Sequence, residues 1–110
     1  MATSEGYREY IADQLSGLDG LSWRAMMGEY ILYLDGVIVG GLYDDRLLVK
    51  PTASALAMMP LAPREKPYEG AKDMLLVTET DESAFLEALL RAIADELPAP
   101  KPKRQKLPQI

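Results

Sequence analysis

The segment from Arg24 to Thr52 constrains the fold of this chain more than any other part of the sequence. It consists of short runs rich in β-branched, aromatic and aliphatic residues, separated by Asp35-Gly36 and Asp44-Asp45. Asp-Gly between such runs is a strong hairpin signal, because a type I′ turn needs a positive φ at both central residues. Such short connections join only antiparallel neighbours, since a parallel crossover needs about a dozen residues or more. The segment therefore predicts an antiparallel meander.

We expect four strands in this meander, over residues 22–27, 30–34, 37–43 and 46–50, with Gly28 marking a turn or bulge between the first two. The pair Gly40-Gly41 removes two side chains from the third strand, which indicates a bulge or the close approach of a helix or another backbone. The apolar centre of residues 73–78 predicts a fifth strand inside the sheet. The segment 60–70 holds three prolines and a glycine and is expected to be loop.

Helical periodicity flanks the strands. Apolar residues at positions 7, 11, 15 and 18 predict a helix over residues 4–17 with Ser4 as its N-cap. Thr52 can cap a short helix over residues 53–59, which Pro60 stops. Apolar residues at positions 86, 89, 90, 93 and 97 predict a last helix over residues 82–97, capped by Thr80 or Asp81.

The order of these elements is α-β-β-β(-β)-α-β-α, which does not alternate helices with parallel strands. The predicted fold class is α+β: two layers, with an antiparallel sheet of four to five strands and helices mainly on one face. Both alternating residue sets of the second and third strands are apolar, so the other sheet face would expose a large apolar patch. A homodimer would bury this patch; the alternative cover is the segment 60–70 together with the chain after residue 97.

The meander also resembles the N-terminal domain of the TfoX/Sxy family, named for regulators of competence for DNA uptake. The residues that carry the resemblance are Met26-Met27-Gly28, Tyr30–Tyr33, Leu34-Asp35-Gly36, Asp44-Asp45-Arg46-Leu47 and Val49-Lys50. The resemblance covers roughly residues 5–97 and implies a two-layer arrangement like that of secretion chaperones, which is often dimeric. Full-length regulators of this family carry a second, helical domain that has no counterpart in these 110 residues. We therefore expect residues 1–97 to form a stand-alone TfoX N-terminal-like domain.

The composition excludes several kinds of active site. Histidine and cysteine are both absent, so disulfides, thiolate metal sites and Ser-His-Asp or Cys-His sites cannot form within the chain. Neither a Walker loop nor a dinucleotide-binding fingerprint occurs. We expect no enzymatic activity, no cofactor and no metal. Asp44-Asp45, with Asp35 or Glu29 as further ligands, is interpreted as a turn and not as a cation site.

The sequence shows no sign of a membrane or export segment. No run of about 18 apolar residues is present, and the N-terminus MATSEGYREY lacks the basic and apolar regions of a secretion signal. We expect a cytoplasmic protein without membrane contact.

Charge is distributed unevenly. Residues 1–97 hold eight Lys/Arg and seventeen Asp/Glu, a net charge of −9, whereas residues 98–110 carry four basic residues and no acid, so that the total is −5. The composition of residues 98–110 predicts a disordered, proline-rich tail. An acidic body repels phosphates, so we expect no nucleic-acid binding by residues 1–97 and at most weak, salt-sensitive contact through the tail. The candidate contacts in the tail are Lys101, Lys103, Arg104 and Lys106; the alternative is a solubilising tail, or one that lies against the acidic body.

The candidate recognition surface combines the family pattern with the predicted strand positions. Its members are Arg24, Glu29, Arg46, Lys50, Tyr68 and Lys72. Arg46 and Lys50 are predicted on one face of the fourth strand, where they could bind an anion; the alternative is a solvated face paired with Glu29 or Asp73. Two other sets of residues are interpreted as structural. The methionines at 26, 27, 58, 59 and 74 are interpreted as core filling, with an adaptable binding groove as the alternative. The aromatic residues at 23, 30, 33 and 43 are interpreted as half-buried sheet residues, with base stacking as the alternative.

The sequence leaves two functions open, from different classes. The first is a non-enzymatic regulatory or adaptor protein that acts through protein–protein contacts with an unknown partner, as the resemblance implies. The alternative is a module that binds a small ligand, or weakly binds nucleic acid, through the Arg46/Lys50 face or the basic tail.

Overall fold

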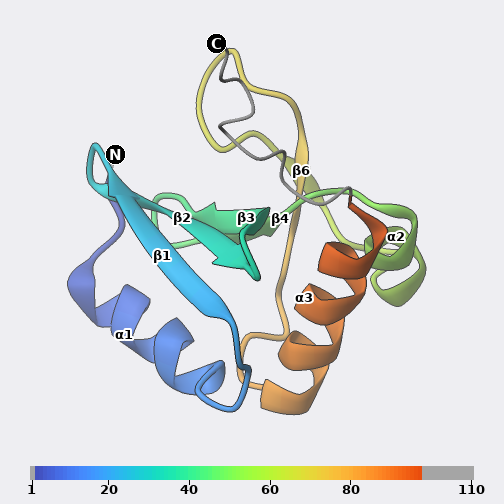
Figure 1. Ribbon diagram of the computed structural model, residues 1–110. Helices are drawn as coiled ribbons and strands as arrows, with labels where there is room; N and C mark the ends of the chain where they lie inside the picture. Colours follow the sequence, from blue (N-terminus) through green and yellow to red (C-terminus); the bar gives the residue numbers. More distant parts are fainter. Residues whose placement is uncertain (1, 98–110) are drawn as a thin grey trace, which may run out of the picture.

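The computed structural model describes residues 2–97 and contains a six-stranded antiparallel sheet with three helices, as Figure 1 shows. The elements in chain order are α1 (Glu5–Gln14), β1 (Leu21–Met26), β2 (Glu29–Leu34), β3 (Val37–Leu42), β4 (Leu47–Val49), α2 (Ala53–Met58), β5 (Arg64–Glu65), β6 (Met74–Leu76) and α3 (Ser83–Glu96). The strands lie in the order β1-β2-β3-β4-β6-β5, and every neighbouring pair is antiparallel. The predicted α+β class is confirmed.

Three two-residue turns build the meander from β1 to β4. Both central residues of each turn have positive φ: 53° and 86° at Met27-Gly28, 52° and 82° at Asp35-Gly36, and 54° and 57° at Asp44-Asp45. This is the type I′ geometry, whose twist matches the right-handed twist of the flanking strands. The reversals predicted at Asp35-Gly36 and Asp44-Asp45, and the turn at Gly28, are therefore confirmed.

The Gly40-Gly41 pair is explained by a bulge and by close backbone contact. The β2–β3 register changes between Leu32, which faces Gly40, and Tyr33, which faces Ile38, so Val39 is the extra residue. A Cβ atom on Gly40 would lie 2.2 Å from the carbonyl oxygen of Leu48 on β4. Any side chain at this position would push β3 away from β4.

The helices cover one face of the sheet and share its core. In Figure 1, α1 and α3 lie on the same side of the strands, and the chain that precedes β6 lies on the other side. The apolar stripes predicted for the two long helices are buried in one cluster with the inner sheet residues Leu32, Val39 and Leu75. The fully buried members from α1 and α3 are Ile11, Leu86, Leu89, Leu90 and Ile93, and Ala55 of α2 joins them.

The sheet has one more strand than predicted. Residues 60–70 were expected to be loop, but Arg64 and Glu65 form β5 and pair with Leu75 and Met74 of β6. The strand is only two residues long and lies between Pro63 and Pro67, so it has no period that could reveal it in the sequence. With β5 at the edge, β6 lies inside the sheet, as its apolar centre predicted.

Several predicted helices and strands are longer than the observed ones, because the apolar residue pattern continues beyond the hydrogen-bonded elements. Helix α1 ends at Gln14, and β4 begins at Leu47 instead of Arg46. Ser4 caps α1 as predicted, since its hydroxyl accepts from the Tyr7 amide at 3.1 Å. The predicted cap of α3 at Thr80 or Asp81 is wrong: the N-cap is Glu82, which makes no side-chain cap bond. Thr80 instead accepts a hydrogen bond from the side chain of Gln14 on its carbonyl oxygen, at 2.9 Å.

The outer sheet face is only partly covered. Tyr68, from the chain between β5 and β6, lies against Tyr43 next to β3, with ring centroids 6.3 Å apart. Tyr43 is 7% exposed, whereas Ile38 of the same face is 38% exposed. The cover predicted for residues 60–70 is thus present at Tyr68; residues 98–110, the other part of that prediction, lie outside the described residues.

Helix α2 is joined to the end of α3 by a carboxylate. Glu96 accepts hydrogen bonds from the backbone amide of Ser54 at 3.0 Å and from its hydroxyl. These bonds hold the pKa of Glu96 below its usual value of 4.5. Because the pKa of Glu96 is lower in the folded state than in the unfolded state, the contact stabilises the fold at pH values above the usual pKa of 4.5. This stabilisation is lost as the pH falls through the lower pKa of the folded state.

Replacement of Glu96 with glutamine is therefore expected to lower the free energy of unfolding at neutral pH, with a difference from wild type that shrinks as the pH falls below 4.5 and is lost below the lowered pKa of Glu96. Urea unfolding at a series of pH values measures this difference. Asp95→Asn is the matched control, because Asp95 is exposed and makes no such bond, and its difference should not vary in this way. A Glu96→Gln difference that is constant from pH 7 to pH 3 would contradict the assignment.

No helix within residues 2–97 combines the length and the apolar character that a membrane crossing requires.

Candidate functional site

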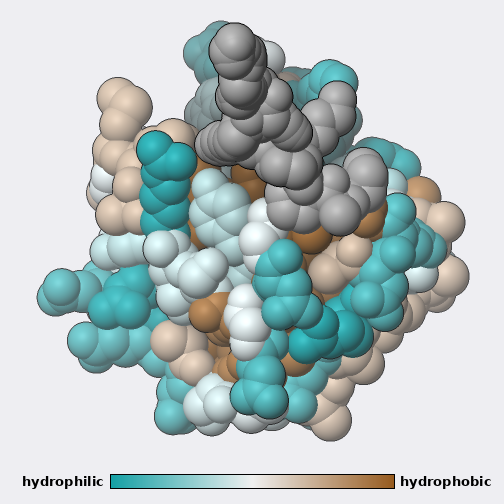
Figure 2. All heavy atoms as spheres, viewed as in Figure 1, coloured by the Kyte–Doolittle hydropathy of each residue, from teal (hydrophilic) through white to brown (hydrophobic). Residues whose placement is uncertain are grey.

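The turn between β1 and β2 presents two methionines to solvent. Met27 is 94% exposed and Met26 is 38% exposed, so their interpretation as core filling is wrong. The reason is the two-residue turn, which places Met27 at its tip with a φ of 53°. In Figure 2 this turn projects from the upper left of the molecule as pale brown apolar surface. A non-glycine residue other than Asn or Asp is uncommon in this left-handed region.

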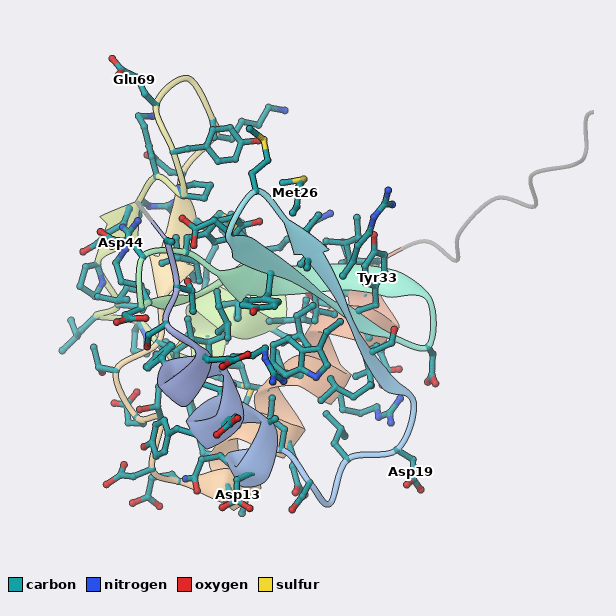
Figure 3. All side chains as sticks on the ribbon, turned by 90° about the vertical axis from the view of Figure 1, so that its left-hand side faces the viewer. Asp13, Asp19, Met26, Tyr33, Asp44 and Glu69 are labelled. Carbon is teal, nitrogen blue, oxygen red and sulfur yellow. The ribbon has the colours of Figure 1, made fainter. Side chains whose placement is uncertain are left out.

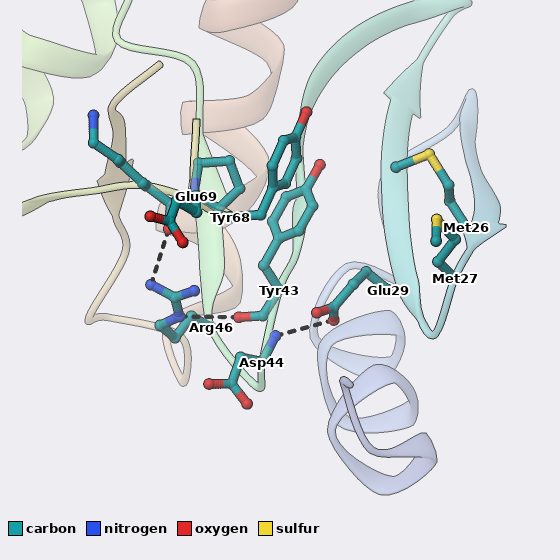
Figure 4. A pocket seen from close by; sticks show the side chains of 10 residues that line it. Met26, Met27, Glu29, Tyr43, Asp44, Arg46, Tyr68 and Glu69 are labelled. Atoms are coloured by element: carbon teal, nitrogen blue, oxygen red, sulfur yellow. Dashed lines mark hydrogen bonds between the residues drawn. The ribbon is translucent and has the colours of Figure 1, made fainter. Parts of the chain in front are cut away.

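Beside this turn lies a hollow of about 750 Å³. Met26 and Met27 form one wall, and Tyr43 and Tyr68 form the opposite wall (Figure 4). The remaining side chains that line it come from Glu29, Asp44, Arg46, Lys66, Pro67 and Glu69. We call this site the methionine–tyrosine hollow. It joins three segments that are distant in sequence: the β1–β2 turn, the β3–β4 turn and the chain after β5.

Tyr43 can lie in the wall of the hollow because Gly41, two residues before it, has no side chain. A Cβ atom on Gly41 would lie 2.7 Å from Cε2 of Tyr43. Burial raises the pKa of Tyr43 above its usual value of 10, and nearby Tyr68 and Glu29 add to this rise. The phenol is therefore neutral at physiological pH, and this part of the wall is an uncharged aromatic surface.

Glu29 holds the two turns beside the hollow together. Its Oε1 accepts hydrogen bonds from the Thr3 hydroxyl at 2.8 Å and from the Asp44 amide at 3.0 Å, the latter drawn in Figure 4. The Thr3 hydroxyl also accepts from the Asp45 amide, and the Asp45 carboxylate accepts from the Ser4 amide at 2.8 Å. Glu29 is therefore a structural residue of this site that fixes the β1–β2 turn against the β3–β4 turn.

Arg46 lies in the hollow but is not available for an anion. Its guanidinium donates to the Glu65 carboxylate at 2.6 Å and to the Tyr43 carbonyl oxygen at 3.0 Å. The predicted alternatives, cross-strand pairs with Glu29 or Asp73, are also wrong, since Asp73 pairs with Lys66 at 3.0 Å. The sequence did not reveal these pairs because they depend on β5, which brings Glu65 next to Arg46.

The structure places the six predicted recognition residues in three separate regions of the surface. Glu29, Arg46 and Tyr68 line the methionine–tyrosine hollow. Lys50 and Lys72 line a second hollow of about 380 Å³ on the other side of Tyr68. Arg24, on β1, lines neither of these hollows. The predicted tail contacts Lys101, Lys103, Arg104 and Lys106 lie outside the described residues.

Carboxylates surround the rim of the methionine–tyrosine hollow. Asp44 and Glu69 are exposed, and no salt bridge within residues 2–97 involves either of them. In Figure 3 both residues and Met26 lie in the upper half of the view, and Asp13 and Asp19 lie at the bottom. Because the two cations of the hollow, Arg46 and Lys66, are already paired, its available charge is negative.

These carboxylates do not form an evident cation site. Within residues 2–97 no group of three acidic side chains gathers in a way that could hold a metal ion. Asp35, one of the further ligands considered from the sequence, accepts from Arg91 of α3 at 2.8 Å. The Asp44-Asp45 pair serves as a turn.

The sequence interpretation favoured structural roles for the residues that give the hollow its apolar walls. Met26, Met27 and Tyr43 were all interpreted as sheet or core residues. One signal was present: Met27 precedes Gly28 at a two-residue reversal, where Asn or Asp is the favoured neighbour of glycine. A large apolar residue at such a position indicates a role outside the fold.

Comparison with known proteins gives the family of this chain. Over 107 residues it is 37% identical to the uncharacterized 12.7 kDa protein in the trpE 5′ region of Spirochaeta aurantia, and the match covers 96% of this chain and 93% of that protein. The chain belongs to the same family as this spirochaete protein. No family model matches the chain, and no solved structure matches it.

The name of the spirochaete relative states no activity. The methionine–tyrosine hollow combines exposed apolar walls with an acidic rim.

Proposed function

We propose that this protein is a non-enzymatic adaptor that binds a protein partner at the methionine–tyrosine hollow. The proposal agrees with the resemblance to TfoX N-terminal domains, which implies a secretion-chaperone-like arrangement. The observation that carries it is Met27, a large apolar side chain that is 94% exposed in a left-handed backbone conformation.

Met27 contributes little to the stability of its own chain. A left-handed conformation costs an ordinary L-residue about 1–2 kcal/mol, which glycine avoids and asparagine reduces. The exposed thioether buries almost no surface in return. Backbone strain of this kind is concentrated at functional sites, and methionine is common on surfaces that adapt to a partner.

The walls and rim of the hollow indicate the chemistry of the partner. Two methionines and two tyrosines offer apolar and aromatic contact, while Asp44 and Glu69 at the rim are unpaired within residues 2–97. A matching segment carries a large apolar side chain for the hollow and a cationic side chain next to it for the rim.

Replacement of Met27 with asparagine separates binding from folding. We expect this variant to unfold at higher urea, with a gain of about 0.5–1 kcal/mol, because asparagine tolerates the left-handed conformation. We also expect it to lose the partner, because the anchor of the hollow is gone. Urea denaturation and quantitative mass spectrometry of proteins captured from the native host measure the two effects.

Leu61→Asn is the matched control, since Leu61 is also apolar and 93% exposed but lines a different hollow. It should capture the same proteins as wild type. If Met27→Asn captures the partner as well as wild type does, the hollow is not the binding site.

The alternative function is supported by the second hollow, where Lys50 and Lys72 lie beside the Tyr68 ring. No salt bridge within residues 2–97 involves either lysine. Such a site fits a small ligand that has both an anionic and a planar group. Binding activity that Lys50→Ala abolishes and Met27→Asn leaves intact would favour this alternative.

A further inference from the structure

The two edges of the sheet differ in how open they are to further pairing. At one edge, β5 has two residues and is flanked by Pro63 and Pro67, which blunt it. At the other edge, β1 has six residues without a proline, and four of them are exposed. Within residues 2–97, only β2 pairs with β1. A long edge strand of this kind is a template for an additional strand.

Two contacts define which backbone groups of β1 point outward. Met26 and Glu29 flank the two-residue turn and therefore form a hydrogen-bonded pair. At the other end of the hairpin, the Asp35 amide donates to the Gly20 carbonyl oxygen at 2.8 Å. Hydrogen-bonded pairs alternate along an antiparallel ladder, so the even-numbered residues of β1 bond to β2. The N–H and C=O groups of Leu21, Trp23 and Ala25 consequently face the open edge.

We infer that β1 pairs with β1 of a second copy of this chain, antiparallel, about a twofold axis at Trp23. In this register Trp23 faces its own counterpart, and Leu21 and Ala25 face each other across the axis. Three hydrogen-bonded pairs form, and two bonds from each give six bonds. The two sheets become continuous, and the contact is isologous, as in most homodimers.

Side-chain charge disfavours one of the two neighbouring registers. Ser22 of each copy faces Arg24 of the other, whereas a shift by two residues would place the two Arg24 side chains directly opposite each other. Like charges in opposed positions destabilise strand pairing. The shifted register would also break the Trp23 pair at the centre. The pairing leaves the methionine–tyrosine hollow open, because Met27 lies beyond the paired residues.

Charge substitutions at the exposed Ser22 test the register. Ser22→Glu would form two cross-strand ion pairs per dimer with Arg24, and Ser22→Lys would create two repulsions with it. Each ion pair or repulsion changes the dissociation constant of the dimer by at most about fivefold. Sedimentation equilibrium of the full chain from micromolar to millimolar concentration measures the dimer constant against the monomer mass of 12.2 kDa. We expect Ser22→Glu to tighten the dimer several-fold and Ser22→Lys to weaken it, with rescue by Ser22→Lys/Arg24→Glu.

Proline at position 25 tests the hydrogen bonds. Ala25→Pro removes an outward N–H, which an edge strand tolerates, and should give a monomer; Ala25→Val keeps the N–H and should still dimerise. Trp23, the single tryptophan, should report dimerisation as a concentration-dependent change in its fluorescence emission.

A wild-type chain that stays monomeric at millimolar concentration would overturn the inference. So would Ser22→Glu and Ser22→Lys variants that dimerise equally, or a folded Ala25→Pro variant that dimerises as wild type does. The Met27→Asn variant should dimerise normally, which separates this inference from the proposed function.

Discussion

Replacement of Gly40 with alanine is expected to destabilise the fold by about 3 kcal/mol. The added Cβ would lie 2.2 Å from the Leu48 carbonyl oxygen and 2.9 Å from Cα of Val49. Both neighbours are backbone atoms in the centre of the sheet, so relief requires β3 and β4 to separate. Over-packing of a well-packed interior costs about 1–3 kcal/mol or more, and the backbone contact places Gly40 at the upper end of that range.

Urea denaturation measures this loss, and Gly6→Ala is the matched control. Gly6 lies in α1 with no atom within 4 Å of the added Cβ, so alanine there should raise the free energy of unfolding by up to about 1 kcal/mol. Equal stabilities of Gly40→Ala and wild type would show that β3 and β4 are not paired as described.

Replacement of Leu90 with alanine is expected to destabilise the protein by about 2–5 kcal/mol. Leu90 is fully buried in the core between α3 and the sheet. Alanine keeps the helix intact, so the loss measures the removal of buried apolar atoms together with the cavity that they leave. Leu61→Ala removes the same atoms from a side chain that is 93% exposed and should change stability by less than about 0.5 kcal/mol. Similar losses in the two variants would contradict the placement of α3.

The parts of the fold that follow from local chemistry were predictable from the sequence. The turns at Asp35-Gly36 and Asp44-Asp45 depend on residues that tolerate positive φ, and the apolar stripes of α1 and α3 follow from helical spacing. The additional strand, β5, was not predictable, because it is two residues long and exists only through its pairing with β6. The cap of α3 was also missed, because Thr80 bonds to α1 instead of the helix start.

The candidate site was predictable only in part. Glu29 and Tyr68 were identified and lie together, but the charge of Arg46 is neutralised by Glu65, which sequence spacing could not place nearby. The apolar walls were missed because methionine in a strand-rich segment is usually buried. Only the turn geometry makes Met27 an exposed residue.

The most direct test of the proposed adaptor function is site-specific photo-cross-linking in the native host. A diazirine amino acid replaces Lys66, a rim residue of the hollow whose charge is already paired with Asp73, and in a second variant it replaces Leu61. We expect a discrete adduct from position 66, which disappears when Met27→Asn is added, and no such adduct from position 61. An adduct from position 66 that persists in the Met27→Asn background, or the same adduct from both positions, would contradict the binding of a partner at the methionine–tyrosine hollow.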